Sequence, residues 1–296
     1  MKQLDHIRIT AEAIRRFIRY SQSPAALMLL QHSRLVQQGA EDADISPLYT
    51  RVTNWHFYNR NLDQDVLQEP VWSFMEPLTF HLSSDRILRK RCEQLKEEAA
   101  KGSLRDCCDL TGRILHHIQD MSTPSHVIPV FHGPLIPDSF ENYLCDAYLA
   151  DEGRLAKIMP DQAVEQAMCT PQPHIPVLQV YQDAAEKTLT LLNSEEANFP
   201  AMVNGRPRDL SWSYFWADKN TSHTGAYPSE CKFGGFGNFG PLGKHFGTTT
   251  VIHAGDDTYL IQQQVYDGLC RQLVEEMLVN SIKTLFLLES DLKKLC

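Results

Sequence analysis

Apolar residues recur three or four positions apart along most of this 296-residue chain, and that spacing limits it to a fold built mainly from helices. Between residues 103 and 119, one such stripe holds Leu104, Cys107, Leu110, Ile114 and Ile118. The same spacing predicts helices over 7–20, 25–38, 139–159 and 175–193, two within 66–100, and a last helix with a break over about 257–295. The sequence therefore predicts an all-α fold.

Residues 198–255 interrupt this pattern, because they are rich in glycine and aromatic residues and carry little helical periodicity. A β-branched run over 248–253 is compatible with a short strand or an extended loop. Because so many aromatic rings bury apolar surface, we expect irregular structure packed over one end of a helical bundle. No repeat or composition break divides the chain, so residues 1–296 are expected to form a single domain.

The formal net charge of −9 argues against a long nucleic-acid groove, which needs clustered Lys and Arg. No apolar run approaches the roughly 20 residues of a transmembrane segment. The first residues lack a charged leader followed by an apolar core, so no signal peptide is expected. A cytoplasmic location, export by a non-classical route, and secretion after trimming of the native start all stay open.

The residues most suggestive of chemistry lie at the end of the helix predicted over 103–119. His116 and Asp120 are four residues apart and share a helical face, Pro124 ends the helix, and His126 follows the bend. Imidazole and carboxylate groups are zinc ligands, so this spacing favours a metal site. His117 points about 100° away from His116 and is expected beside the ligands or at the surface.

Other ligand-type residues flank this motif: His6, Asp44 and His56 before it, and His132 and Glu141 after it. The order H…D…H…HxxxD…H…E on a nearly all-helical chain resembles the zinc-dependent phospholipases C, whose fold is shared by fungal single-strand nucleases. The matching residues are 6–10 with 13–14, 39–44, 55–58, 115–126 and 140–143, roughly the first half of the chain.

Members of this family hold three zinc ions in one cleft at the end of a helical bundle, so the resemblance implies a trinuclear cleft with two to three Zn²⁺. It implies that one zinc is bound by Asp44, His56, His116 and Asp120, a second by His6 with Asp120 bridging, and a third by His126, Glu141 and one further nitrogen ligand.

The chain departs from the family pattern at three places. The family has a histidine four residues before its glutamate, but position 137 is Pro, which leaves His132 as the nearest substitute and Asp138 as the alternative. Asp42 lies close to Asp44; the latter is favoured because it follows Gly39 by five residues. The family also binds its second zinc through an N-terminal tryptophan, whereas Met1 precedes His6 by only five residues here.

The activity implied by the resemblance is a phospholipase C. It would cleave the glycerol-side phosphodiester bond of a phospholipid at a membrane surface, with phosphatidylcholine preferred, by metal-activated water. A carboxylate not fully used as a ligand, Asp44 or Asp42, would act as the catalytic base. Two alternatives stay open: a single-strand-preferring zinc nuclease or nucleotidase on the same scaffold, and a non-catalytic helical protein with a degraded metal site.

Overall fold

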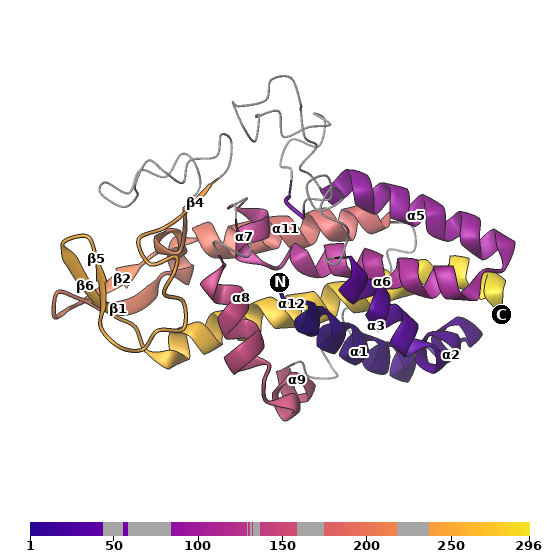
Figure 1. Ribbon diagram of the computed structural model, residues 1–296, viewed down its shortest axis with the longest axis horizontal. Helices are drawn as coiled ribbons and strands as arrows, with labels where there is room; N and C mark the ends of the chain where they lie inside the picture. Colours follow the sequence, from indigo (N-terminus) through magenta and orange to yellow (C-terminus); the bar gives the residue numbers. More distant parts are fainter. Residues whose placement is uncertain are drawn as a thin grey trace, which may run out of the picture.

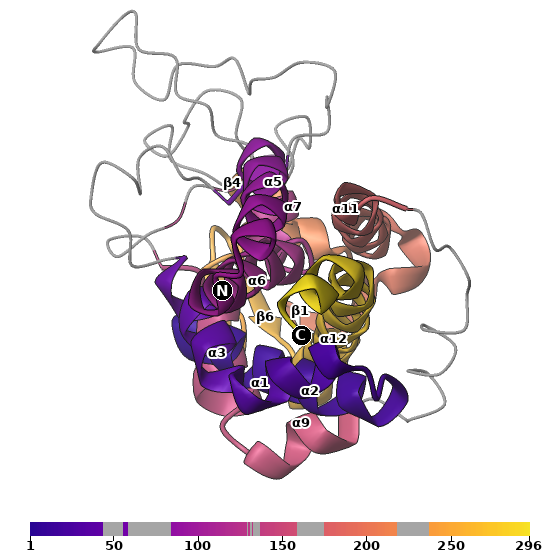
Figure 2. The same cartoon turned by 90° about the vertical axis from the view of Figure 1, so that its right-hand side faces the viewer.

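The computed structural model describes residues 1–43, 56–58, 84–128, 130, 132, 137–158, 175–217 and 237–296. Five long helices run along the long axis (Figure 1): α1 (Gln3–Tyr20), α5 (Ser84–Lys101), α6 (Leu104–Asp120), α11 (Val177–Asn193) and α12 (Gln263–Leu292). Seen end-on, α6 and α12 lie between α5 and α11 on one side and α1 on the other (Figure 2). The predicted helical bundle is thus confirmed for the described residues.

The predicted stripe on α6 faces the core, and α3 (Ser33–Asp42) packs against this helix at two glycines. Cys107, Ile114 and Ile118 have no exposed surface. A Cβ atom on Gly112 would lie 2.0 Å from the Val36 carbonyl oxygen, and one on Gly39 would lie 2.1 Å from the Asp109 carbonyl oxygen. Only glycine allows the two backbones to come this close.

Several predicted helix boundaries were wrong. The helix predicted over 25–38 is divided at His32 into α2 (Pro24–Gln31) and α3. Within the helix predicted over 139–159, the described residues form α8 (Ser139–Tyr143), a π-helical turn over Leu144–Tyr148, and α9 (Glu152–Ile158). By contrast, α12 continues without the predicted break, and the residues before it form a strand.

A small β-sheet corrects the all-α prediction and lies at one end of the bundle (Figure 1). Its strands β1 (Phe199–Val203), β2 (Arg206–Leu210), β5 (Ile252–Ala254) and β6 (Asp257–Leu260) are antiparallel in the order β2-β1-β6-β5. A separate ribbon pairs β3 (Trp216–Ala217) with β4 (Asn238–Phe239). The segment 198–255 is therefore not wholly irregular.

The hairpin between β1 and β2 has a specific local cause. Asn204 and Gly205 connect the strands with φ angles of 49° and 75°. Positive φ at both central residues is the geometry that Asn-Gly favours in a tight hairpin turn. Along β1, buried Phe199, Ala201 and Val203 alternate with exposed residues, which anchors the sheet in the core.

The described helices also bear on membrane insertion. Among them, none combines the length and the apolar composition that crossing a bilayer requires.

Candidate metal centre

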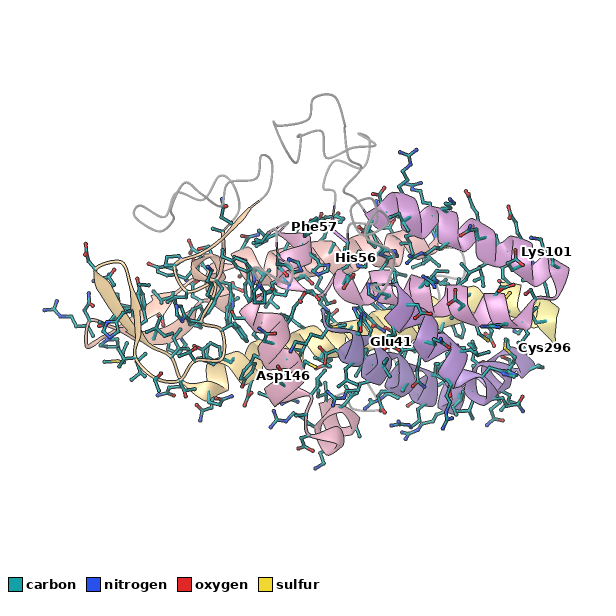
Figure 3. All side chains as sticks on the ribbon, in the orientation of Figure 1. Glu41, His56, Phe57, Lys101, Asp146 and Cys296 are labelled. Carbon is teal, nitrogen blue, oxygen red and sulfur yellow. The ribbon has the colours of Figure 1, made fainter. Side chains whose placement is uncertain are left out.

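The structure brings together all the predicted ligands that it describes. His6 comes from α1, His116 and Asp120 from the end of α6, His126 from the short helix α7 (Pro124–Val127), and Glu141 from α8. His56 and His132 lie outside the described helices, and His56 lies near the middle of the long axis (Figure 3). Asp44, expected to be both a ligand and the catalytic base, lies outside the described residues.

The carboxylate of Asp120 occupies the middle of the first group. Its Oδ2 atom lies 2.7 Å from His56 Nδ1 and 3.1 Å from His116 Nε2, and its Oδ1 atom lies 3.4 Å from His6 Nε2. The rings of His6 and His116 are stacked with centroids 3.8 Å apart. The two oxygens therefore face different imidazoles.

A second group forms around Glu141. Its Oε1 atom lies 3.3 Å from both His126 Nε2 and His132 Nε2, and 2.6 Å from the backbone nitrogen of Met1. The alternative ligand, Asp138, instead caps α8 by accepting a hydrogen bond from the Phe140 N–H at 3.0 Å. Of the two candidates, His132 is therefore the one that faces the group.

Hydrogen-bond acceptors beside the two groups determine which ring nitrogen carries the proton in four of the histidines. The Nδ1 atoms of four histidines lie within 3.0 Å of carbonyl oxygens: His6 of Gln119 Oε1, His116 of the Ala40 oxygen, His126 of the His56 oxygen, and His132 of the Val130 oxygen. A carbonyl oxygen only accepts, so each Nδ1 carries a proton, and each Nε2 faces a carboxylate. Two of these Nε2 atoms have a donor nearby: His56 Nδ1 lies 2.7 Å from His116 Nε2, and the Met1 ammonium lies 3.3 Å from His126 Nε2. Metal-binding histidines show this arrangement of a ligating nitrogen and a second, hydrogen-bonded nitrogen.

The electrostatics of the buried groups agree with this geometry. Burial alone would raise the pKa of Asp120, but the neighbouring His126 and His116 hold it well below its usual value. Burial lowers the pKa of His126 to about 4, so this imidazole is neutral near pH 7. For His132, burial acts in the same direction, but the Glu141 carboxylate outweighs it and raises the pKa.

Among the residues that the structure describes, three sets of ligand atoms are compact enough to hold a metal ion. They are His6, His116 and Asp120; His56, His117 and Asp120; and His126, His132 and Glu141, and within each set the ligand atoms lie within 4.8 Å of one another. Nitrogen and carboxylate oxygen donors of this kind suit zinc among other divalent metals. These buried groups could therefore hold a metal ion.

Gln119 was not identified from the sequence in its role, whereas His117 was expected beside the ligands or at the surface. Gln119 is fully buried, and its Nε2 atom lies 3.1 Å from Thr10 Oγ1 and 3.2 Å from Ser281 Oγ, which leaves Oε1 to accept from His6. His117, expected beside the ligands or at the surface, is fully buried beside them. The only sequence signal for either is its place within the HxxxD motif.

Asp42, the alternative to Asp44, lies at the end of α3 and is partly exposed. Its Oδ2 atom lies 4.0 Å from Arg113 Nη2. Among the described residues, it belongs to none of the compact ligand sets. Asp42 is therefore not part of the metal centre as the described residues form it.

Comparison of the chain with models of protein families, with curated proteins and with solved structures finds no match in any of the three. The resemblance to zinc-dependent phospholipases C therefore stays a prediction from the motifs. The metal centre itself stands on the distances and hydrogen bonds of the residues described.

Proposed function

We propose that this protein is a zinc-dependent phosphodiester hydrolase, most specifically a phospholipase C acting on phosphatidylcholine or a similar phospholipid. One observation carries the proposal: imidazoles with hydrogen-bonded Nδ1 atoms surround two carboxylates, the buried Asp120 and the partly buried Glu141. The resemblance of the motifs supports the choice of zinc and of the phosphodiester reaction. The expected complement is two to three Zn²⁺ ions.

The two groups adjoin, which is what a multi-metal site requires. His126 belongs to the Glu141 group, and its Nδ1 atom lies 3.6 Å from Asp120 Oδ2 in the other group. When bound, adjacent zinc ions supply positive charge for the phosphoryl oxygens and lower the pKa of a water molecule. The ligand residues are largely or fully buried, and a low-dielectric surrounding strengthens such charge interactions.

The residues of the chain divide the remaining tasks. The two oxygens of Asp120 contact different imidazoles and hold them close together. Gln119 and the Ala40 carbonyl keep the protons of His6 and His116 on Nδ1, so that Nε2 is the nitrogen available to a metal. In this proposal, Asp44 adds a ligand and acts as the base. The net charge of −9 disfavours a polyanionic nucleic acid, so a phospholipid is the preferred substrate over a single-stranded nucleic acid.

The test is the zinc content per chain together with hydrolysis of phosphatidylcholine vesicles, before chelation, after it, and after zinc is restored. We expect two to three zincs, release of a phosphorylated head group, loss of this activity with chelator and its return with zinc. Bound zinc with turnover of single-stranded DNA but not of lipid would assign the nuclease activity instead. Fewer than two zincs per chain would overturn the proposal and indicate a degraded site.

A further inference from the structure

An arginine–histidine pair adjoins the metal centre between α5 and α6. Arg91 Nη1 lies 2.6 Å from His117 Nε2 and 3.0 Å from the carbonyl oxygen of Arg113. Only 7% of Arg91 and none of His117 is exposed. Burying a guanidinium beside the ligands costs free energy unless it is hydrogen-bonded, and the contacts with His117 and the Arg113 oxygen offset this cost.

The guanidinium fixes the proton on His117. Arginine stays protonated in proteins and only donates hydrogen bonds, so His117 Nε2 must accept and Nδ1 must carry the proton. This Nδ1–H group is buried, and no acceptor for it lies within hydrogen-bond distance among the described residues. The pair therefore leaves one oriented donor without a protein acceptor.

His117 belongs to one of the three compact sets, but its hydrogen bond with Arg91 prevents it from acting as a ligand there. A ring nitrogen of His117 lies within 4.8 Å of a His56 ring nitrogen and an Asp120 oxygen, and the rings of His56 and His117 are 5.2 Å apart. However, Arg91 occupies the Nε2 lone pair, and Nδ1 holds the proton. The ligand histidines turn lone pairs toward the centre, whereas His117 has only an N–H to offer.

We propose that His117 Nδ1–H donates a hydrogen bond to an anionic oxygen bound at the metal centre, namely a phosphoryl oxygen of a phosphate ester. Arg91 is the positioning residue that holds His117 in the donating tautomer. This inference rests on the proposed metal-dependent function and adds an anion-binding residue to it. A donor of fixed direction selects an oxygen position, which metal ions alone do not do.

The first test is calorimetric binding of inorganic phosphate to the zinc-loaded protein. His117→Leu removes the donor, and His117→Asn keeps an N–H near the same place. We expect unchanged zinc content in both variants, about 10- to 100-fold weaker phosphate binding in His117→Leu, and near-normal binding in His117→Asn. Full-strength phosphate binding by zinc-loaded His117→Leu would overturn the inference. Absence of zinc from the unaltered protein would instead overturn the proposed function.

The second test reads the proton directly and needs no change at His117. Nitrogen-15 NMR of the histidine rings should show His117 as the Nδ1–H tautomer, with its Nδ1–H signal shifted when phosphate is added to the zinc-loaded protein. Arg91→Met should release the tautomer, whereas Arg89→Met on the exposed face of α5 should not. An Nε2–H tautomer, or an Nδ1–H signal that phosphate leaves unmoved, would refute the inference even if the His117 variants fail to fold.

Discussion

Gln119 shows how a residue outside the candidate ligand sets can orient a candidate ligand, His6. Its side-chain amide is held by Thr10 and Ser281, so its oxygen faces His6 Nδ1 at 2.8 Å. Removing this acceptor leaves a buried N–H without a partner and releases the tautomer of the imidazole. The orientation of His6 Nε2 toward Asp120 therefore depends on the neutral amide of Gln119, which precedes Asp120 in the sequence.

Replacing Gln119 with leucine should weaken both the fold and the metal site. We expect a loss of about 1–3 kcal/mol in the free energy of unfolding and roughly 10- to 100-fold weaker binding of one zinc. Urea denaturation and competition with a coloured chelator measure the two effects. Gln179→Leu, on the exposed part of α11, is the control and should change neither. Unchanged zinc affinity in Gln119→Leu would show that His6 is not a ligand.

Asp120 is the residue on which both carboxylate–imidazole sets of α6 depend. Asp120→Asn keeps the shape of the side chain but removes the charge that the surrounding imidazoles stabilise, so we expect at least one zinc per chain to be lost. Metal analysis after gel filtration measures this. Asp109→Asn is a matched change on the same helix, because Asp109 is partly exposed and pairs with Arg113. Equal zinc content in the two variants would contradict the assignment of Asp120 as the shared ligand.

At the scale of single residues, the sequence predicted the candidate ligands but not the hydrogen-bond partners that orient them. Residue type and spacing predicted imidazoles and carboxylates that the structure brings together, because only a few side chains bind zinc. The tautomers could not be predicted, since they depend on acceptors such as the Ala40 carbonyl on another helix. The pairing of Arg91 with His117 was hidden for the same reason, because it depends on how α5 packs against α6.

Among the elements, the contact between α3 and α6 has the most direct bearing on the site. The close approach at Gly112 and Gly39 brings the end of α3 over α6, where the Ala40 oxygen lies 2.8 Å from His116 Nδ1. A pair of small residues is therefore needed for a ligand histidine to be oriented. The glycine that the motif comparison used as a landmark for Asp44, Gly39, has this packing role of its own.

Gly112→Ala should separate α3 from α6, because its Cβ atom would lie 2.0 Å from a backbone oxygen that has no free rotamer to yield. We expect a loss of about 1–3 kcal/mol in unfolding free energy, measured in urea, and a weaker zinc site. Gly268→Ala in α12 is the control: nothing lies within 4 Å of its Cβ position, so alanine should stabilise by about 0.5–1 kcal/mol. A destabilised control or an unchanged Gly112→Ala would contradict this account.

Helix periodicity predicted the long helices but missed the hairpin turn and the π-helical turn, which depend on local sequence. The Asn204-Gly205 turn signals a hairpin, but the aromatic composition around it was interpreted as irregular packing. The predicted helix over 139–159 contains a π-helical turn, which the apolar pattern does not distinguish from an α-helix. The predicted break in the last helix does not occur, because α12 buries side chains along its whole length against the rest of the bundle.

At the scale of the whole molecule, the metal centre connects parts of the chain that are far apart in sequence. His6 lies on the first helix, His116 and Asp120 follow more than a hundred residues later, and Glu141 follows on α8. The buried Asp120 and the partly buried Glu141 bring negative charge into this region, where an unpaired charge is costly. A cation bound there would therefore stabilise both the site and the packing of α1, α6 and α8 around it.

Removing the metal should for this reason destabilise the entire fold and not only abolish activity. A ligand that binds only the folded state stabilises it by about 4 kcal/mol at a free concentration a thousand times its dissociation constant. For a chain of this size, that corresponds to a fall in melting temperature on the order of 10 °C after chelation. Calorimetric scans with and without chelator measure the shift, and zinc should reverse it. In Asp120→Asn the same chelator should produce a smaller shift, since part of the metal is already lost. An identical melting temperature with and without chelator in the unaltered protein would mean that Asp120 and Glu141 are neutralised without a metal, by their histidines and the Met1 ammonium, and that the cluster is an ion-pair network.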